Sequence, residues 1–336
     1  MTRIRVLTIN VENVEGDDRR TKAINQEVRR IEPDLVSFQE VIQTPERGQL
    51  DELLTGTELH GTHQADVISY APPWVDRYGG TAVATRWPHT TLEVLDMRVA
   101  GAADVPWCTV AVTVPIPGEG EVLFIGTTAA WRLNAEAVRE QQAVALTDLD
   151  ARHRQSLPSI IAGDFNAAPD AASIRYLRGL QSLGGRSVHY HDAWDVAGAG
   201  PGYTWTVDNP NTRQVVDAVV RQPDHRRRID YIFIGSWHEH RDTYCQVRSA
   251  TIAFDQPIDG VWASDHFGVI VDVDIGTTHP TVVQSLTEMA DNQDHTSTTA
   301  AVNTKIVAAP PDPDDSAMKL PANTRPVMRE NHAHEA

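Results

Sequence analysis

Five short polar motifs, each joined to an apolar run rich in β-branched residues, constrain this chain more than any other feature. Runs of this kind predict buried strands, so each motif places a carboxylate, a carboxamide or an imidazole beside a strand. Such oxygen-rich groups suit hard divalent cations. The pattern predicts strands that carry ligands to one edge of a sheet. In chain order the motifs are Ile9-Asn10-Val11, Gln39-Glu40-Val41, Gly163-Asp164-Phe165-Asn166, Arg228-Ile229-Asp230-Tyr231 and Ser264-Asp265-His266.

The remaining periodicity predicts a strand-rich chain with few helices. Helical spacing of apolar residues predicts helices at 17–31, 50–54, 134–149 and 173–180, whereas 60–78 has no clear period and is predicted to be a loop. Many strands with few helices favour two sheets packed face to face, with the helices outside. The predicted strands are 3–11, 34–39, 79–86, 92–99, 107–114, 122–128, 159–162, 203–206, 228–234, 246–252 and 269–273.

The composition of the chain changes at residue 277. Segment 291–299 is polar, and 308–315 is acidic and rich in proline. We therefore predict one domain at 1–276, followed by a mostly disordered acidic tail at 277–336. Within that tail, a short helix is predicted at 282–289.

The charge of the chain bears on the kind of substrate it binds. The formal net charge is −17, of which residues 277–336 contribute −4, so the predicted domain carries −13. Tight nonspecific binding of duplex nucleic acid needs a basic surface, because released counterions drive that binding. The acidic charge therefore favours a small phosphorylated substrate over nucleic acid. The alternative is that this charge only aids solubility, since a local basic groove can exist on an acidic protein.

Cysteine usage and hydropathy indicate the compartment. Neither Cys108 nor Cys245 belongs to a CxxC pair, which argues against a zinc site or a disulfide framework and fits a reducing environment. No apolar run approaches the roughly 20 residues that span a bilayer. The strand pattern starts at residue 3 and leaves no room for a signal peptide. We expect a cytoplasmic protein that does not bind membranes; its oligomeric state is not predicted.

The five motifs and their order resemble the endonuclease/exonuclease/phosphatase superfamily, which has the deoxyribonuclease I-like fold. The resemblance covers about residues 3–275. It implies an α/β protein of the α+β type, a four-layer sandwich of two mostly antiparallel sheets with helices outside. It also implies a metal-dependent hydrolase of phosphoric esters, in which Glu40, Asn10 and Asp265 hold Mg²⁺ or Mn²⁺.

The other motif residues have side chains that fit catalysis. Asp164 is expected to orient or deprotonate the attacking water, and Asn166 to donate to a nonbridging phosphate oxygen. Asp230 is expected to orient His266, whose imidazolium then neutralises charge on the phosphoryl group. Each motif alone has a plain alternative, such as an Asp/Asn-rich turn or a glutamate in solvent. The ordered set favours the functional interpretation.

One element of the superfamily pattern is missing. Members usually carry a threonine-histidine pair at the end of the strand before the long helix. Here that strand ends in Gly126-Thr127-Thr128-Ala129, so the histidine position falls at Thr128, or at Ala129 if the loop shifts. Three consequences are open. Hydrolysis is slowed, since a general acid contributes about 10² to 10⁴ in rate; another residue substitutes for the histidine; or the scaffold performs different metal-assisted chemistry. The candidate substitutes on loops are His60, His63, His89, His189 and His191.

Three functions stay open at the level of sequence. The leading hypothesis is a divalent-metal-dependent phosphoesterase acting on a small phosphorylated molecule or a phosphodiester. The second is a nuclease, which a basic groove around Arg86, Arg132 and Arg139 would support. The third is a diverged member that binds a ligand or transforms a specialised metabolite. The arginine run 226–228 is either a solvated face or a phosphate contact, and Trp205 either stacks on a ligand or is buried.

Overall fold

The computed structural model describes residues 1–277 with the exception of 103–104, 237 and 241–242. The predicted tail from residue 278 onward, with its helix at 282–289, lies outside the described residues, and the domain boundary at 276/277 stays a prediction. Among the described residues, no helix combines the length and the apolarity that crossing a bilayer requires.

The first sheet brings the two ends of the described chain together. Its strand order is β15-β16-β1-β2-β6-β5. The β1 and β2 strands are parallel and the other pairs are antiparallel, so the last strand of the described chain lies between β15 and β1. The bounds are β1 (Thr2–Asn10), β2 (Leu35–Val41), β5 (His60–His63), β6 (Gly80–Thr85), β15 (Thr243–Ala253) and β16 (Gly268–Thr277).

The second sheet is built from the middle of the chain, in the order β11-β14-β10-β9-β8-β7. Only the β9–β10 pair is parallel. At the end of β10, Asp164 is opposite Thr128 of β9 and Asp230 of β14. The bounds are β7 (Thr90–Asp96), β8 (Cys108–Ile116), β9 (Gly120–Thr128), β10 (Ile160–Asp164), β11 (Tyr190–Asp192) and β14 (Asp230–Gly235).

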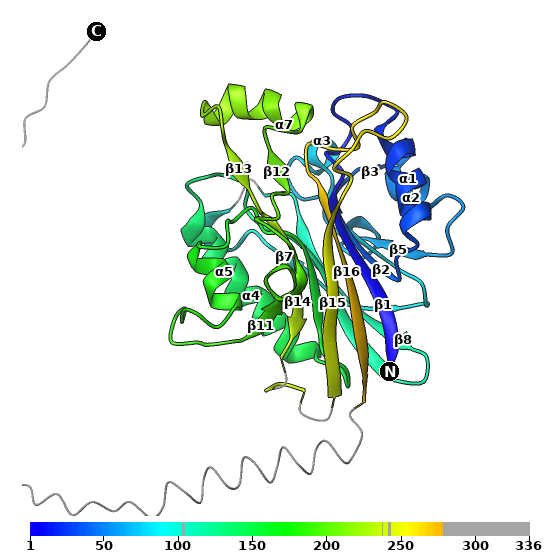
Figure 1. The fold of residues 1–336 in the computed structure, drawn as a ribbon, viewed down its shortest axis with the longest axis vertical. Helices are drawn as coiled ribbons and strands as arrows, with labels where there is room; N and C mark the ends of the chain where they lie inside the picture. The colour runs from blue at the N-terminus through cyan, green and yellow to red at the C-terminus, as the bar shows by residue number, and fades with distance from the viewer. Residues whose placement is uncertain (103–104, 237, 241–242, 278–336) are drawn as a thin grey trace, which may run out of the picture. The chain divides into compact units, whose positions relative to one another are not determined.

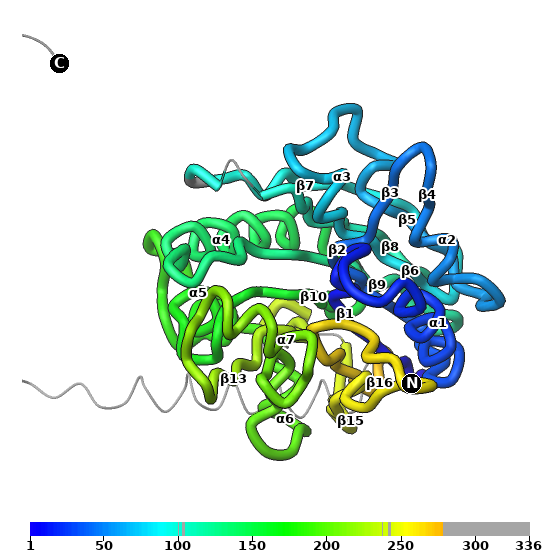
Figure 2. The backbone as a smooth tube through the Cα atoms, turned by 90° about the horizontal axis from the view of Figure 1, so that it is seen from above, coloured from blue at the N-terminus to red at the C-terminus, as the bar shows by residue number. Residues whose placement is uncertain are grey.

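Three apolar layers hold four structural layers together. The central one lies between the sheets and includes Val6, Phe124 and Val271. A second packs α1 (Arg20–Ile31) and α2 (Gln49–Leu54) on the first sheet. A third packs α4 (Glu136–His153) and α5 (Ala172–Leu177) on the second sheet. Figures 1 and 2 show these helix pairs on opposite sides of the two sheets. The predicted four-layer sandwich is confirmed.

The first helix shows why the local predictions succeed. In α1 the residues Ala23, Ile24, Val28 and Ile31 are buried on one side, as their helical spacing predicts. The helix then ends because Glu32 adopts a left-handed conformation (φ 50°) and Pro33 cannot continue it.

The predicted loop at 60–78 is wrong in part. It contains β5, the 3₁₀ turn η1 (Gln64–Asp66) and α3 (Val75–Tyr78). The His-Gly-Thr-His sequence of β5 has no apolar alternation because the strand lies at the sheet edge and is held by backbone pairing with β6. The remaining short elements are β3 (Gln43–Thr44), β4 (Arg47–Gly48), η2 (Val99–Gly101), α6 (Ala193–Ala197), β12 (Trp205–Thr206), α7 (Pro210–Val215), a π-helical turn η3 (Val216–Val220) and β13 (Arg226–Arg227).

Candidate active site

The strand directions bring the predicted site residues to one end of the sandwich. The parallel strands β1 and β2 carry Asn10 and Glu40 at or near their carboxyl ends, whereas the antiparallel β16 begins just after His266. In the second sheet, β10 ends at Asp164 and β14 begins at Asp230. In Figure 1 this end of the sheets lies toward α3 and α7, away from the N-terminus.

Asn10 joins the two halves of the site. Its Nδ2 donates to Glu40 Oε1 at 3.1 Å and to Asp164 Oδ2 at 3.2 Å. Its Oδ1 accepts the backbone N–H of Glu12 at 2.9 Å. In this arrangement Asn10 positions two carboxylates through its nitrogen, and ligation of a cation through its oxygen stays a prediction.

Glu40 is a carboxylate whose surroundings disfavour its charge. Burial first, and then the nearby charge of Asp265, raise the pKa of Glu40 to about 8, although the hydrogen bond from Asn10 acts the other way. A second amide, Asn13 Nδ2, donates to Glu40 Oε2 at 3.0 Å. The backbone of Glu40 has a φ of 60°, a strained conformation for a residue with a side chain. Left-handed backbone recurs at Glu12, Asn13 and Asn166, so strain is concentrated at this site.

Asp164 and Asn166 form a compact turn after β10. Asp164 accepts the Asn166 backbone N–H at 2.8 Å and its Nδ2 at 3.0 Å. Burial raises the pKa of Asp164 to about 7, while His266 opposes that rise and Asp230 adds to it. The Nδ2 of Asn166 also donates to the carbonyl of Ala129 at 3.2 Å. A contact from Asn166 to a phosphate must therefore replace one of these two bonds.

The structure brings together the predicted pair Asp230 and His266. The imidazole Nδ1 lies 3.0 Å from Asp230 Oδ2, and its Nε2 lies 3.9 Å from Asp164 Oδ2. Burial lowers the pKa of His266, but Asp230, Asp265 and Asp164 outweigh that effect and raise it well above its usual value. These carboxylates favour the protonated form of His266, whose Nε2 is directed toward Asp164.

Asp265 is anchored by two residues that the motifs do not contain. Trp205 Nε1 donates to Asp265 Oδ2 at 3.2 Å, and the Asp265 backbone N–H donates to Glu12 Oε2 at 2.9 Å. Trp205 is 8% exposed, which supports the buried alternative, although its ring also lines the cavity described below. Burial, and then Asp265, raise the pKa of Glu12 to about 7. Sequence reasoning missed Glu12 and Asn13, whose only signal is that they follow the Asn10 motif directly.

The excess of carboxylates fits a divalent cation. Glu12, Glu40 and Asp164 all have pKa values near or above neutrality because burial and like charges disfavour their ionised forms. A cation that binds their oxygens would relieve this repulsion. The ligand atoms of Asp164, Asp230 and His266 lie within 4.8 Å of one another. However, Asp230 is already paired with the imidazole Nδ1 of His266, at 3.0 Å. The donor chemistry therefore favours the Glu40 and Asp265 side, where hard oxygen ligands suit Mg²⁺ or Mn²⁺.

Thr128 is packed and bonded within the sandwich. Its side chain is fully buried, and its Oγ1 lies 2.8 Å from Oγ1 of Thr81. None of the loop histidines named above lies on the cavity wall within the described residues. For instance, His89 contacts Thr62 and Thr85 beside the first sheet. Among the described residues, none of these five histidines therefore takes over from the missing one.

A cavity of about 510 Å³ lies above these groups. Its floor contains Glu40, Asp164, Asp265 and His266, and its walls are mainly apolar and aromatic. Five of the wall residues are large apolar side chains that remain substantially exposed, and we call them the apolar collar. They are Trp74 (57%), Trp131 (46%), Leu133 (50%), Val215 (38%) and Val219 (55%).

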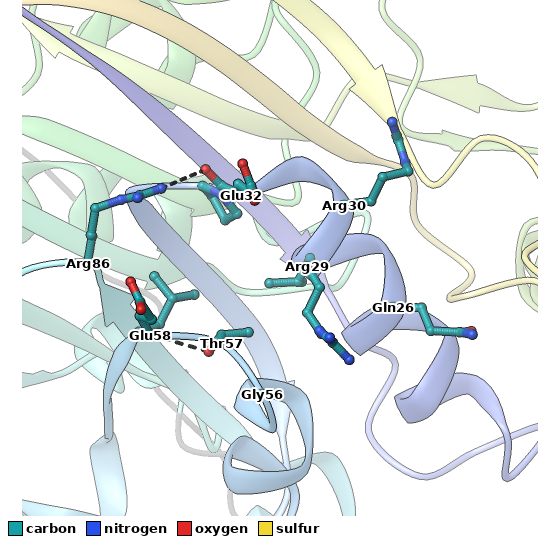
Figure 3. A pocket seen from close by; sticks show the side chains of 11 residues that line it. Gln26, Arg29, Arg30, Glu32, Gly56, Thr57, Glu58 and Arg86 are labelled. Atoms are coloured by element: carbon teal, nitrogen blue, oxygen red, sulfur yellow. Dashed lines mark hydrogen bonds between the residues drawn. The ribbon is translucent and has the colours of Figure 1, made fainter.

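A second cavity, of about 550 Å³, lies between α1 and segment 56–59. Figure 3 shows Arg29, Arg86 and Glu58 around it, with Arg86 donating to the carbonyl of Glu32 at 3.1 Å. Arg86 also pairs with Asp34. This cavity contains no cluster of carboxylates and imidazole, so the smaller cavity has the chemistry of an active site.

The site and the fold together define a metal-dependent hydrolase of phosphoester bonds. The sequence profile of the Endonuclease/Exonuclease/phosphatase family matches residues 7–266. The chain belongs to that family, whose members are divalent-metal-dependent enzymes of this class. No curated protein matches the chain.

Solved structures show the same fold at low sequence identity. TDP2 of D. rerio complexed with single strand DNA product is 18% identical, with a TM-score of 0.61, over 82% of this chain and 100% of that one. An endonuclease/exonuclease/phosphatase from Bacteroides vulgatus is 16% identical, with a TM-score of 0.60, over 82% and 99%. The human nocturnin catalytic domain with bound sulfate anion is 19% identical, with a TM-score of 0.56, over 81% and 94%.

Proposed function

We propose that this enzyme hydrolyses a small phosphoester that carries an apolar or aromatic group, with Mg²⁺ or Mn²⁺. The proposal rests on one observation: the carboxylates of the floor and the residues of the apolar collar line the same cavity. Charged floors suit the cation and the phosphoryl group, whereas exposed tryptophans gain free energy when they cover an apolar group. A substrate with both parts fits this cavity.

The described residues divide the work of an in-line water attack. Glu40 and Asp265 would hold the cation, which would supply Lewis-acid chemistry to the phosphoryl group when bound. Asp164 accepts a proton from the attacking water, because burial places its pKa near neutrality. His266, oriented by Asp230, presents Nε2 toward the same place and stabilises developing negative charge.

Two of the three arginines that were expected to form a nucleic-acid groove have other contacts, whereas the third, Arg132, lines the active-site cavity. Arg139 is 4% exposed and donates to the carbonyls of Ala130 and Arg132 at 2.9 and 2.7 Å. Arg86 belongs to the second cavity, beside Glu32. Together with the net charge of −17, these contacts favour a small substrate over nucleic acid.

The first experiment is a panel of phosphoesters. It contains p-nitrophenyl and methyl phosphomonoesters and diesters, nucleotides, sugar phosphates and plasmid DNA, each with Mg²⁺, Mn²⁺ or chelator. We expect metal-dependent turnover that Asp164→Asn abolishes. Asp208→Asn is the matched control, because Asp208 is exposed and pairs with Arg226 away from the floor. If plasmid DNA is cleaved faster than every small ester, with strong salt dependence, the nuclease is the better assignment.

The collar gives a separate prediction. Trp131→Ala should raise KM for p-nitrophenyl esters, and leave KM for methyl esters nearly unchanged, because only the aromatic group covers the indole. Steady-state kinetics on the two series measures this difference. An equal change in both series would remove the argument for an apolar substrate.

The diverged, non-hydrolytic alternative is tested by restoring the imidazole. Thr128 is fully buried and hydrogen-bonded to Thr81, so a histidine at position 128 needs additional space. The double variant Thr81→Ala/Thr128→His provides that space, and Thr81→Ala alone is its control. Large gain of phosphoesterase activity would indicate that the natural chain serves another reaction. No gain, beside an active wild type, supports the proposed function.

We also keep the cytoplasm as the proposed compartment, because Cys108 and Cys245 are both free thiols. Cell fractionation with an antibody against the chain tests this, and recovery outside the cytoplasmic fraction would overturn it.

A further inference from the structure

We propose that Arg227 supplies the positive charge that the absent histidine would otherwise bring to the phosphoryl group. With Asn166, it forms a subsite for a tetrahedral oxyanion. The inference rests on the proposed function, since the oxyanion is the phosphoryl group of its substrate. It assigns a further residue that touches the substrate and explains how the site tolerates Thr128.

The three consecutive arginines differ in their partners. Arg226 pairs with Asp208, at 3.0 Å between Nη2 and Oδ1. Arg228 pairs with Asp192 at 2.8 Å and with Asp195 at 2.9 Å. Arg227 has no carboxylate within 4.0 Å among the residues that the structure describes. Its hydrogen bond is from Nη2 to the backbone carbonyl of Asn166, at 2.6 Å.

The surroundings of Arg227 disfavour its positive charge. Burial lowers the pKa of Arg227 below its usual value, and the neighbouring Arg139 adds to that effect, while Asp164 opposes it. Arg227 is half-buried, and a partly desolvated cation without an ion-pair partner is destabilising. Arg227 lines the same cavity as Asp164 and His266. An anion in that cavity would compensate its charge.

Arg227 reaches the site beside the position of the missing histidine. Thr128 is opposite Asp164 across the β9–β10 pair, and the next residue, Ala129, accepts a hydrogen bond from Asn166 Nδ2 at 3.2 Å. The carbonyl of the same Asn166 accepts from Arg227. Asn166 therefore lies between the strand end that lacks an imidazole and the guanidinium.

The antiparallel pairing of β12 with β13 explains how this side chain is positioned. Arg227 is directly opposite Trp205 in that pair. Trp205 contacts Asp265, and Arg227 contacts Asn166, so this one strand pair holds residues on both sides of the floor. Arg226, the neighbour in sequence, has its side chain with Asp208 instead.

A guanidinium is suited to this task. It presents five N–H donors in a planar fork, and the observed contact uses one Nη2–H group, which leaves donors for two phosphoryl oxygens. It stays protonated throughout the physiological range, so it stabilises charge without transferring a proton. Proton transfer then remains with Asp164 and His266.

Steady-state kinetics on the best ester of the panel tests the assignment. The variants are Arg227→Ala and Arg227→Lys, with Arg226→Ala as the matched control from the same strand. We expect Arg227→Ala to lower kcat by about 10² to 10³. Arg227→Lys should show a smaller fall in kcat, and Arg226→Ala should keep a kcat near that of wild type. Added methylguanidinium should raise kcat of Arg227→Ala by about tenfold or more and leave wild type unchanged, which a purely structural role would not do.

Calorimetric binding of inorganic phosphate in the presence of Mg²⁺ separates this inference from the proposed function. If wild type hydrolyses an ester but Arg227→Ala retains kcat and phosphate affinity, Arg227 is not the subsite and the function stands. If wild type hydrolyses no ester, yet binds phosphate in an Arg227-dependent way, the subsite stands and the function fails. Loss of activity in Arg227→Ala without rescue, and with unchanged phosphate affinity, would also overturn the subsite.

Discussion

At the scale of single residues, the carboxylates of the floor link stability to pH and metal. Their pKa values are raised to about 8 for Glu40 and about 7 for Glu12 and Asp164, whereas such carboxyls titrate near 4 in an unfolded chain. Between these values the folded protein binds more protons than the unfolded chain. The free energy of unfolding of the metal-free protein therefore falls as the pH rises through this window.

We expect Mg²⁺ to stabilise the protein more at about pH 8 than at about pH 5, because the carboxylates that it compensates are then ionised. Glu40→Gln should flatten the pH dependence and weaken the effect of Mg²⁺. Chemical unfolding with chelator or Mg²⁺, at several pH values, measures both. An unchanged pH slope in Glu40→Gln would contradict the raised pKa of Glu40, and an unchanged stabilisation by Mg²⁺ would contradict the assignment of Glu40 to the cation site.

Asp230 gives a second prediction at this scale. Asp230→Asn keeps the shape of the side chain but removes the charge that raises the pKa of His266. We expect kcat to fall by about 10² to 10⁴, and the alkaline limb of the pH–rate profile to move to lower pH, because His266 then loses its proton earlier. A fall in kcat without that displacement would mean that Asp230 only maintains the fold. The exposed Asp208→Asn is again the control.

At the scale of elements, the parallel β9–β10 pair fixes where Asp164 lies. A Cβ added at Gly163 would lie 2.0 Å from the carbonyl oxygen of Thr127, so the glycine is required by close backbone approach. Gly163→Ala should lower the free energy of unfolding by about 1–3 kcal/mol or more. Gly118→Ala meets no atom within 4 Å and has only the strain of its φ of +79°, about 1–2 kcal/mol. Urea unfolding compares them, and equal losses would remove the steric argument.

The elements also show which predictions from sequence were possible. The strands β1, β2, β9, β10 and β14 were found because apolar runs mark strands that are buried on both faces. The predicted strand 203–206 covers β12. The edge strand β5 and the two-residue strand β13 were not predicted, because their stability comes from pairing with neighbours rather than from apolar side chains. The elements α7 and η3, which carry Val215 and Val219, were not predicted, so the sequence did not indicate the apolar collar.

At the scale of the whole molecule, β16 decides where the domain can end. This strand pairs with β15 on one side and β1 on the other, so it is interior to the first sheet. We expect a chain of residues 1–277 to keep the melting temperature and the metal-dependent activity of the full chain. A chain that ends at residue 267 should fail to fold, because β1 and β15 lose their common partner. Circular dichroism melting and activity test both, and a large loss in the longer chain would contradict the predicted boundary at 276/277.

The sequence by itself determined the five motifs, their order on buried strands and hence the family, because burial imposes an apolar pattern that neighbouring residues reveal. It also showed that no histidine stands at position 128. Only the tertiary structure decided which groups meet. Glu12 accepts a hydrogen bond from the backbone of Asp265, and Asn10 links the two sheets. Within the described part of the chain, Arg227 has no carboxylate partner, whereas Arg226 and Arg228 have theirs. These relations depend on side-chain direction after two sheets have packed, and residues distant in sequence carry no local sign of it.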